Sequence, residues 1–214
     1  MRAIAAILIS LSLAIFARAQ TTLSLSGDVF AARHTQAKLL LSADAAKPGD
    51  TIWAGVDLKM EPGWHTYWKN PGEAGQATEI QWQLPPGITA GEIQWPLPEK
   101  LPPADITTYG YEDEVMLLVP LKVGTNFSAG LIELKAKVSW LECKESCIPA
   151  SADVQTALNV GSETKTSADA AAMESWKSKV PTSLTNGSFL VQAWWEKPST
   201  NDLRPIVLEF RPTI

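Results

Sequence analysis

Apolar and polar residues alternate along several stretches of this chain. In residues 52–60 and 132–140 every second side chain is apolar, and residues 154–160 follow the same pattern with one threonine among the apolar positions. Side chains of a β-strand point alternately to the two faces of its sheet. Each of these stretches therefore predicts a strand with one buried face.

Further strands are expected from shorter apolar runs that are bounded by glycine or proline turns. They are residues 36–43, 78–83, 88–95, 115–123, 189–195 and 206–210. The run 115–123 is almost continuously apolar, which indicates a strand buried on both faces. Six of the 15 prolines lie between 85 and 103, so this segment is expected to be an irregular loop at a sheet edge or end. Many short strands with such turns favour an all-β sandwich over a thioredoxin-like α/β fold.

Residues 1–19 have the pattern of a secretory signal peptide. Arg2 is followed by an apolar run up to Phe16, and Ala17 and Ala19 flank Arg18 in the small-x-small pattern of a cleavage site. A membrane anchor is the alternative, but the apolar run is short for a span. We expect export and a mature chain that starts at Gln20.

The exported part is expected to contain one domain and the start of another. Residues 20–160 hold the predicted sandwich, and residues 161–186 form a linker with a helix over 168–179 that Pro181 ends. Residues 187–214 carry two further strands, too few to close a core. We therefore expect a second β-domain to begin there, in a chain that is a fragment of a longer polypeptide.

The net charge argues against two classes of partner. The chain has 18 basic and 23 acidic residues; removal of Arg2 and Arg18 with the signal leaves 16 and 23, a change in net charge from −5 to −7. An acidic chain is a poor ligand for nucleic acid or for anionic membrane surfaces.

Cys143 and Cys147 are the only cysteines. In an oxidising compartment such a pair is either a small staple or a reversible two-electron switch. Residues four apart in a straight strand are separated by about 13 Å, so the segment must turn if the bond forms. A loop this small stabilises a fold by only about 2 kcal/mol, which favours redox function over stapling. The positive charge of Lys144 favours a cysteine thiolate, and the negative charges of Glu142 and Glu145 oppose it. The alternative is that all three are solvated loop charges.

No other residues suggest a cofactor. His34 and His65 are the only histidines, and they are expected to be surface or core residues because no metal-binding motif accompanies them. Two thiolates can bind Cu(I), so a copper-handling module stays open. A non-catalytic binding module with a structural disulfide is the other alternative. We expect no cofactor and no metal.

Five spaced motifs follow one another along the chain. They are WHTYW (64–68), NPG (70–72), WP (95–96), YGYE (109–112) and WLECKESCIP (140–149). Together they resemble the N-terminal periplasmic domain of the DsbD-like thiol:disulfide interchange proteins, and within that family the ScsB-type branch is the most similar. The resemblance covers about residues 35–160.

The resemblance implies an immunoglobulin-like sandwich whose Cys143–Cys147 pair exchanges electrons. It implies a thioredoxin-like domain as donor, fed by a membrane domain. The implied acceptors are periplasmic proteins with disulfides, such as disulfide isomerases or cytochrome c maturation proteins. The mature protein is then periplasmic, and its full-length form lies in the inner membrane.

The resemblance also implies roles for single residues. Cys147 is the expected residue of the mixed disulfide. A cap loop that covers the disulfide in the family corresponds to Thr108, Tyr109 and Gly110, with Tyr109 as the lid and Gly110 as a point of freedom. The alternative is that Tyr109 and Tyr111 are ordinary strand aromatics. The neighbouring aromatic residues Tyr67 and Trp68 are expected either to line the site or to pack in the core.

Overall fold

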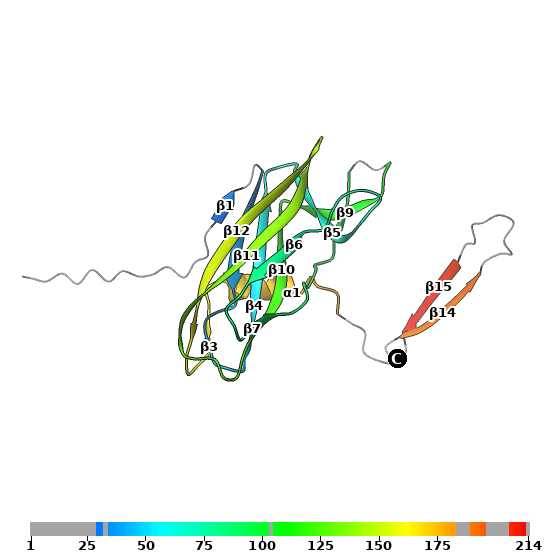
Figure 1. Cartoon of the computed structure of the whole chain (residues 1–214). Helices are drawn as coiled ribbons and strands as arrows, with labels where there is room; N and C mark the ends of the chain where they lie inside the picture. The colour runs from blue at the N-terminus through cyan, green and yellow to red at the C-terminus, as the bar shows by residue number, and fades with distance from the viewer. Residues whose placement is uncertain (1–28, 32–33, 103–104, 183–188, 196–205, 213–214) are drawn as a thin grey trace, which may run out of the picture.

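The computed structural model describes residues 29–31, 34–102, 105–182, 189–195 and 206–212. These residues form two packed β-sheets, one helix and a separate β-hairpin (Figure 1). The predicted all-β immunoglobulin-like sandwich is confirmed. The predicted signal peptide, residues 1–19, lies outside the described residues.

The first sheet has five antiparallel strands. Their order is β1 (Val29–Ala31), β2 (Thr35–Leu41), β4 (Thr51–Met60), β10 (Glu114–Val123) and β7 (Ile88–Ala90). β7 is a three-residue edge strand, so it forms only the first part of the predicted strand 88–95. Beyond it, Gln94 makes an isolated bridge to Leu118.

The second sheet contains eight strands and carries the cysteines. Its order is β13 (Lys165–Thr166), β3 (Ala43–Ala46), β12 (Cys147–Val160), β11 (Gly130–Cys143), β5 (His65–Gly72), β9 (Thr108–Glu112) and β8 (Glu99–Leu101), and β6 (Glu79–Gln83) also pairs with β11. β5 and β6 share one edge of β11. β6 pairs with its middle, while β5 meets it only at its end, where His65 lies opposite Cys143.

The core lies between the two sheets and is built by the predicted alternation. The even-numbered residues from Ile52 to Met60 are all buried, as are the even-numbered residues from Leu134 to Trp140. In β10 the odd-numbered residues from Val115 to Val123 belong to the same cluster. The periodicity therefore predicted these strands and their inward faces correctly.

One helix covers the outer face of the first sheet. Helix α1 (Ala170–Lys177) lies against this sheet (Figure 1). It places Met173, 3% exposed, against Leu40, Met116 and Leu118. Gly55 makes room for this contact, since a Cβ there would lie 3.0 Å from Met173 Cε. The helix explains why residues 115–123 are apolar on both faces: one face meets the core and the other meets α1. The predicted helix-bearing linker thus packs on the sandwich.

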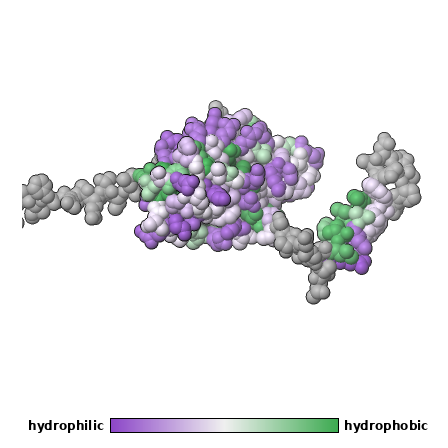
Figure 2. All heavy atoms as spheres, turned by 60° about the horizontal axis from the view of Figure 1, so that its bottom comes forward, coloured by the Kyte–Doolittle hydropathy of each residue, from purple (hydrophilic) through white to green (hydrophobic). Residues whose placement is uncertain are grey.

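Strands β14 (Phe189–Trp195) and β15 (Ile206–Pro212) form a two-stranded antiparallel sheet. The pairing puts Val191, Trp195, Leu208 and Phe210 on one face of the hairpin. These side chains are more than half exposed. Figure 2 shows a hydrophobic patch on the hairpin. That this hairpin starts a second domain stays a prediction. Within the part of the chain that the structure describes, no helix is long and apolar enough to cross a bilayer.

Candidate functional site

The two cysteines close the end of a long β-hairpin. β11 and β12 pair without interruption from Gly130 and Val160 to Cys143 and Cys147. Figure 1 shows the tip of this hairpin at the top of the molecule. The three residues between the cysteines turn the chain, so the two Cα atoms lie 4.2 Å apart and the sulfurs are joined at 2.06 Å. The structure confirms the turn that a disulfide at this spacing required.

The two cysteines differ in their exposure to solvent. Cys143 is 2% exposed and packs with Tyr67 and Leu101, whereas Cys147 is exposed. Side-chain alternation puts Cys143 on the outer face of its sheet, away from the sandwich core. A protein thiol can therefore approach Cys147 directly, while Cys143 is shielded.

Strand β5 brings two polar side chains to the disulfide. His65 and Tyr67 are two residues apart and share a face, and both are buried. His65 Nε2 lies 3.3 Å from the Tyr67 hydroxyl, which lies 3.5 Å from Cys147 Sγ. The disulfide sulfur carries no hydrogen, so Tyr67 donates to Cys147 and accepts from His65 Nε2–H.

Burial keeps both of these groups neutral near pH 7. Desolvation lowers the pKa of His65 from its ordinary 6.5, and the Glu112 carboxylate on β9 opposes part of that effect. Desolvation also raises the pKa of Tyr67 above its ordinary 10.0. Tyr67 is therefore a hydroxyl donor, and His65 is an imidazole able to accept a proton.

Two segments cover Tyr67 and Cys143. Leu101, at the end of β8, is 1% exposed and packs on both side chains. Gly75 lies against the Tyr67 ring, with φ +104° and no space for a Cβ. The loop that carries Gly75 is fastened by Glu73, whose Oε1 accepts from the Thr107 N–H at 2.8 Å and whose own N–H donates to Thr107 O.

The predicted cap residues lie in β9, which pairs with β5 and β8. Gly110 stands opposite Tyr67, and a Cβ there would overlap Thr66 O and come within 2.7 Å of Leu101 Cδ1. Glycine is thus needed for close strand contact. Thr108 is buried, and Tyr109 is half-buried. Tyr109 alternates with Gly110, so its side chain leaves the opposite side of the strand, and its role as a lid stays a prediction.

Trp68 does not share the face of Tyr67. It is half-buried and packs against the main core between the sheets. Of the two aromatic residues expected either to line the site or to pack in the core, the structure puts Tyr67 at the disulfide and Trp68 at the core.

The charged residues around the cysteines have different environments. Lys144 and Glu145 are exposed. Glu142 is fully buried, and its Oε2 accepts from Trp140 Nε1 at 3.3 Å. The prediction of a solvated loop charge is therefore wrong for Glu142. It occupies an inward position of β11, two residues after Trp140, so its carboxylate faces the core.

Sequence reasoning missed Leu101, Gly75 and the contact of His65 with Tyr67. Leu101 lies in the proline-rich segment that was expected to be irregular, and Gly75 lies in a turn-rich loop. The only available signal for His65 was its spacing of two from Tyr67, which puts both on one face of a strand.

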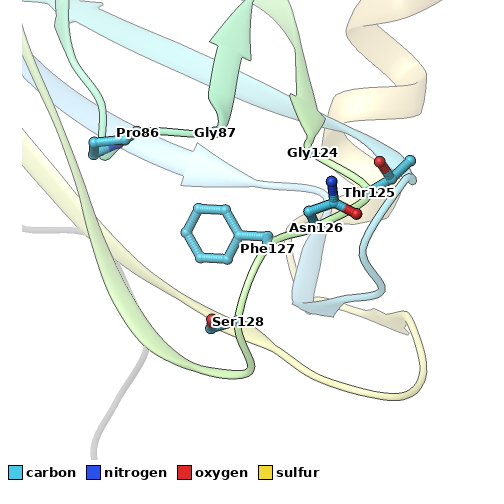
Figure 3. A pocket seen from close by; sticks show the side chains of 7 residues that line it. All are labelled: Pro86, Gly87, Gly124, Thr125, Asn126, Phe127 and Ser128. Atoms are coloured by element: carbon cyan, nitrogen blue, oxygen red, sulfur yellow. The ribbon is translucent and has the colours of Figure 1, made fainter.

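A pocket lies apart from the disulfide, and the described residues show no metal centre. The pocket is lined by Pro86, Gly87 and residues 124–128, and the Phe127 ring is part of this lining (Figure 3). It adjoins the start of β11, about 40 Å along the strand from Cys143 at the usual rise per residue. Among the described residues, no group of three or more His, Cys, Asp or Glu side chains is arranged to hold a metal ion.

Comparisons with known proteins agree with this architecture. The structure is similar to the crystal structure of the N-terminal periplasmic domain of ScsB from Proteus mirabilis, with a TM-score of 0.53 and 20% identity. The match covers 88% of this chain and 86% of that one. A comparison with curated protein sequences finds no match.

Residues 36–159 match the family described as thiol:disulfide interchange protein DsbD, N-terminal. This match spans the sandwich from β2 to β12, including the cysteine hairpin and the strands that bring His65, Tyr67 and Leu101 to it. The chain therefore belongs to the DsbD N-terminal family of thiol:disulfide interchange proteins.

Proposed function

We propose that the Cys143–Cys147 pair is a reversible redox switch that passes reducing equivalents from a thioredoxin-like donor to periplasmic acceptor proteins. The observation that carries this proposal is the unequal exposure of the two cysteines. Cys147 is exposed at a hairpin tip, and Cys143 is covered by Tyr67 and Leu101. Thiol–disulfide exchange needs one sulfur open to attack and a second that completes the reaction within the same protein.

The exchange proceeds through Cys147. A donor thiolate attacks Cys147 Sγ, a mixed disulfide forms, and the Cys143–Cys147 bond breaks with its electron pair going to Cys143. Cys143 takes up a proton. The second donor cysteine then attacks the donor sulfur of the mixed disulfide and releases Cys147, so two electrons and two protons have been transferred. The same steps in reverse reduce an acceptor disulfide.

Several features of the hairpin support reversible use of this bond. β11 and β12 hold the cysteines opposite each other through their own ladder, so the ends need no covalent bond to stay close. A loop of about five residues contributes only about 2 kcal/mol by chain entropy. The bond can therefore be broken at small cost to the fold.

The partners follow from the family. The donor is a thioredoxin-like domain supplied by a membrane domain, and the acceptors are disulfide isomerases or cytochrome c maturation proteins. Residues 1–19 are the signal for export, and the site works in the periplasm. The full-length protein lies in the inner membrane.

The reduction potential of the pair tests the proposal. After equilibration in glutathione or dithiothreitol buffers and thiol trapping, we expect a value between about −270 and −180 mV, the range of thioredoxins and isomerases. A value well below about −300 mV is typical of structural bonds and would reject the switch. Cys143→Ser and Cys147→Ser should each abolish exchange with a thioredoxin-like protein and lower the free energy of unfolding by about 2 kcal/mol or less.

A further inference from the structure

His65 is placed beside both cysteines. It is the cross-strand partner of Cys143, and the side chains of such a pair have Cβ atoms about 4.5–5.5 Å apart. Its Nε2 also reaches Cys147 through the Tyr67 hydroxyl, over contacts of 3.3 and 3.5 Å. Thiol–disulfide exchange requires protons to leave and reach these sulfurs, so a nearby group must carry them.

The polarity of this hydrogen-bond chain suits a thiolate. With the disulfide formed, His65 Nε2–H donates to Tyr67 and the Tyr67 hydroxyl donates to Cys147 Sγ. A Cys147 thiolate with an imidazolium at His65 needs the same two donors in the same directions. The oxidised protein thus already holds the arrangement that stabilises the reactive form of the reduced protein.

The surroundings of His65 leave it able to take up a proton. Tyr67 on β5 and Cys143 on β11 face it, and Glu112, its register partner on β9, is the nearby carboxylate. Lys144, at the hairpin tip, is exposed, and its Nζ lies 3.4 Å from Pro62 O. Burial lowers the pKa of His65, so the imidazole is neutral at neutral pH, and Glu112 favours the cation once it forms.

We propose that His65 is a positioning residue that orients the Tyr67 hydroxyl toward Cys147 and accepts the Cys147 thiol proton through it. In the reduced chain with Cys147 as a thiol, His65 is the Nδ1–H tautomer and Nε2 is free to accept. The Cys147 S–H proton passes to Tyr67 oxygen, and the Tyr67 hydroxyl proton passes to His65 Nε2. The products are a Cys147 thiolate and an imidazolium. The use of this thiolate in exchange rests on the proposed function, but its formation does not.

During reduction of an acceptor the proton is returned. The Cys147 thiolate attacks the acceptor disulfide, a mixed disulfide forms, and the acceptor sulfur that leaves as a thiolate takes up the proton from the imidazolium. Cys143, opposite His65, then attacks Cys147 Sγ and releases the second acceptor sulfur, which takes up the proton that Cys143 gives up and leaves as a thiol. The acceptor gains two electrons and two protons, and the Cys143–Cys147 bond is restored.

The test is the pH dependence of Cys147 alkylation by iodoacetamide in the reduced full chain, with the modified residue identified by mass spectrometry. His65→Gln keeps a side-chain donor but cannot take up a proton, and Tyr67→Phe removes one oxygen. Each should raise the midpoint of the profile by about one pH unit, which lowers the rate near pH 7 about tenfold. The double variant should be no slower than either single variant, because both act in one chain.

His34→Gln is the matched control. His34 stacks on Trp64 with ring centroids 3.7 Å apart and bonds Glu61, so it shares the residue type without contacting Tyr67. It should leave the profile unchanged. A wild-type profile in His65→Gln overturns the proposal, provided the oxidised variant melts at the wild-type temperature. If that variant does not fold, a wild-type profile in Tyr67→Phe overturns it instead.

A second readout reports the imidazole itself. The His65 ring resonances, followed by NMR against pH, should show a higher pKa in the reduced wild-type chain than in reduced Cys147→Ser. Equal values in the two proteins would contradict proton sharing. A cysteine pair that resists exchange with a thioredoxin-like dithiol would reject the proposed function, while both readouts would still report on the His65–Tyr67–Cys147 chain.

Discussion

Cys147 is exposed and contacts a hydroxyl, whereas Cys143 is buried against apolar side chains. Thiolates are stabilised by hydrogen-bond donors and disfavoured by apolar burial. The environments of the two cysteines support the proposed roles, with Cys147 as the attacking or attacked residue and Cys143 as the resolving one. Tyr67 is central to both, since it bonds Cys147 and packs on Cys143.

The position of Tyr67 depends on Gly75. Gly75→Ala places a Cβ inside the Tyr67 ring volume, on a backbone that already has φ +104°. We expect the ring to be displaced, with a loss of about 1–3 kcal/mol in the free energy of unfolding and slower alkylation of Cys147. Chemical denaturation and the alkylation assay measure these effects.

Gly130→Ala separates backbone strain from the overlap at Gly75. Gly130 has φ +150°, and a Cβ there meets nothing within 4 Å. It should destabilise the fold less than Gly75→Ala and leave Cys147 reactivity unchanged. Equal effects of the two substitutions would show that the contact with Tyr67 is not important.

Two elements, β5 and α1, have structural roles that their sequences alone did not predict. β5 contributes side chains to both faces of the second sheet. His65 and Tyr67 point outward to the disulfide, while Trp68 packs on the core. α1 packs on the outer face of the first sheet, against Leu40 of β2 and Met116 and Leu118 of β10, so β10 has apolar residues on both faces. The core and the helix-covered face are therefore separate from the disulfide.

Met173→Ala tests whether α1 is part of the sandwich. Met173 is 3% exposed against Leu40, Met116 and Leu118, and removal of a buried methionine side chain costs about 2–5 kcal/mol. We expect a loss at the lower end of that range, measured by denaturant unfolding, with an unchanged reduction potential. Glu174→Ala, on the exposed side of the helix, is the control. A loss below about 0.5 kcal/mol, the usual effect of a surface substitution, would mean that α1 is only a linker.

For the molecule as a whole, stability should fall as the pH rises toward neutrality because of one carboxyl group. Burial and the neighbouring Glu114 raise the pKa of Asp57 from 3.8 to about 7. The folded state therefore binds more protons than the unfolded state between these values, and unfolding becomes easier as the pH rises through that window. Lys38 and Lys59 reduce the effect.

Asp57→Asn removes this titration. Between pH 5 and 8 we expect the wild type to lose about 1–3 kcal/mol of unfolding free energy relative to the variant. Denaturant unfolding at several pH values measures the difference, and Asp153→Asn, at an exposed position, is the control. Parallel pH profiles for wild type and Asp57→Asn would rule out a raised pKa at Asp57.

The strands could be predicted because their signal is local. Alternation in residues 52–60 and 132–140 reports which side chains face the core, and β4 and β11 have these inward faces. The turn between the cysteines followed from their spacing, and the five motifs indicated the family. Strand β14 was predicted at its observed bounds, since all but one of its residues, Gln192, are apolar.

The site depends on contacts between distant residues, which no local pattern contains. Tyr67 and Cys147 are 80 positions apart, and they meet because β5 reaches the edge of β11 only at Cys143. The burial of Glu142, the cover formed by Leu101 and Gly75, and the packing of α1 arise in the same way. Periodicity sets which face of a strand a side chain occupies, but the pairing of strands sets what that face meets.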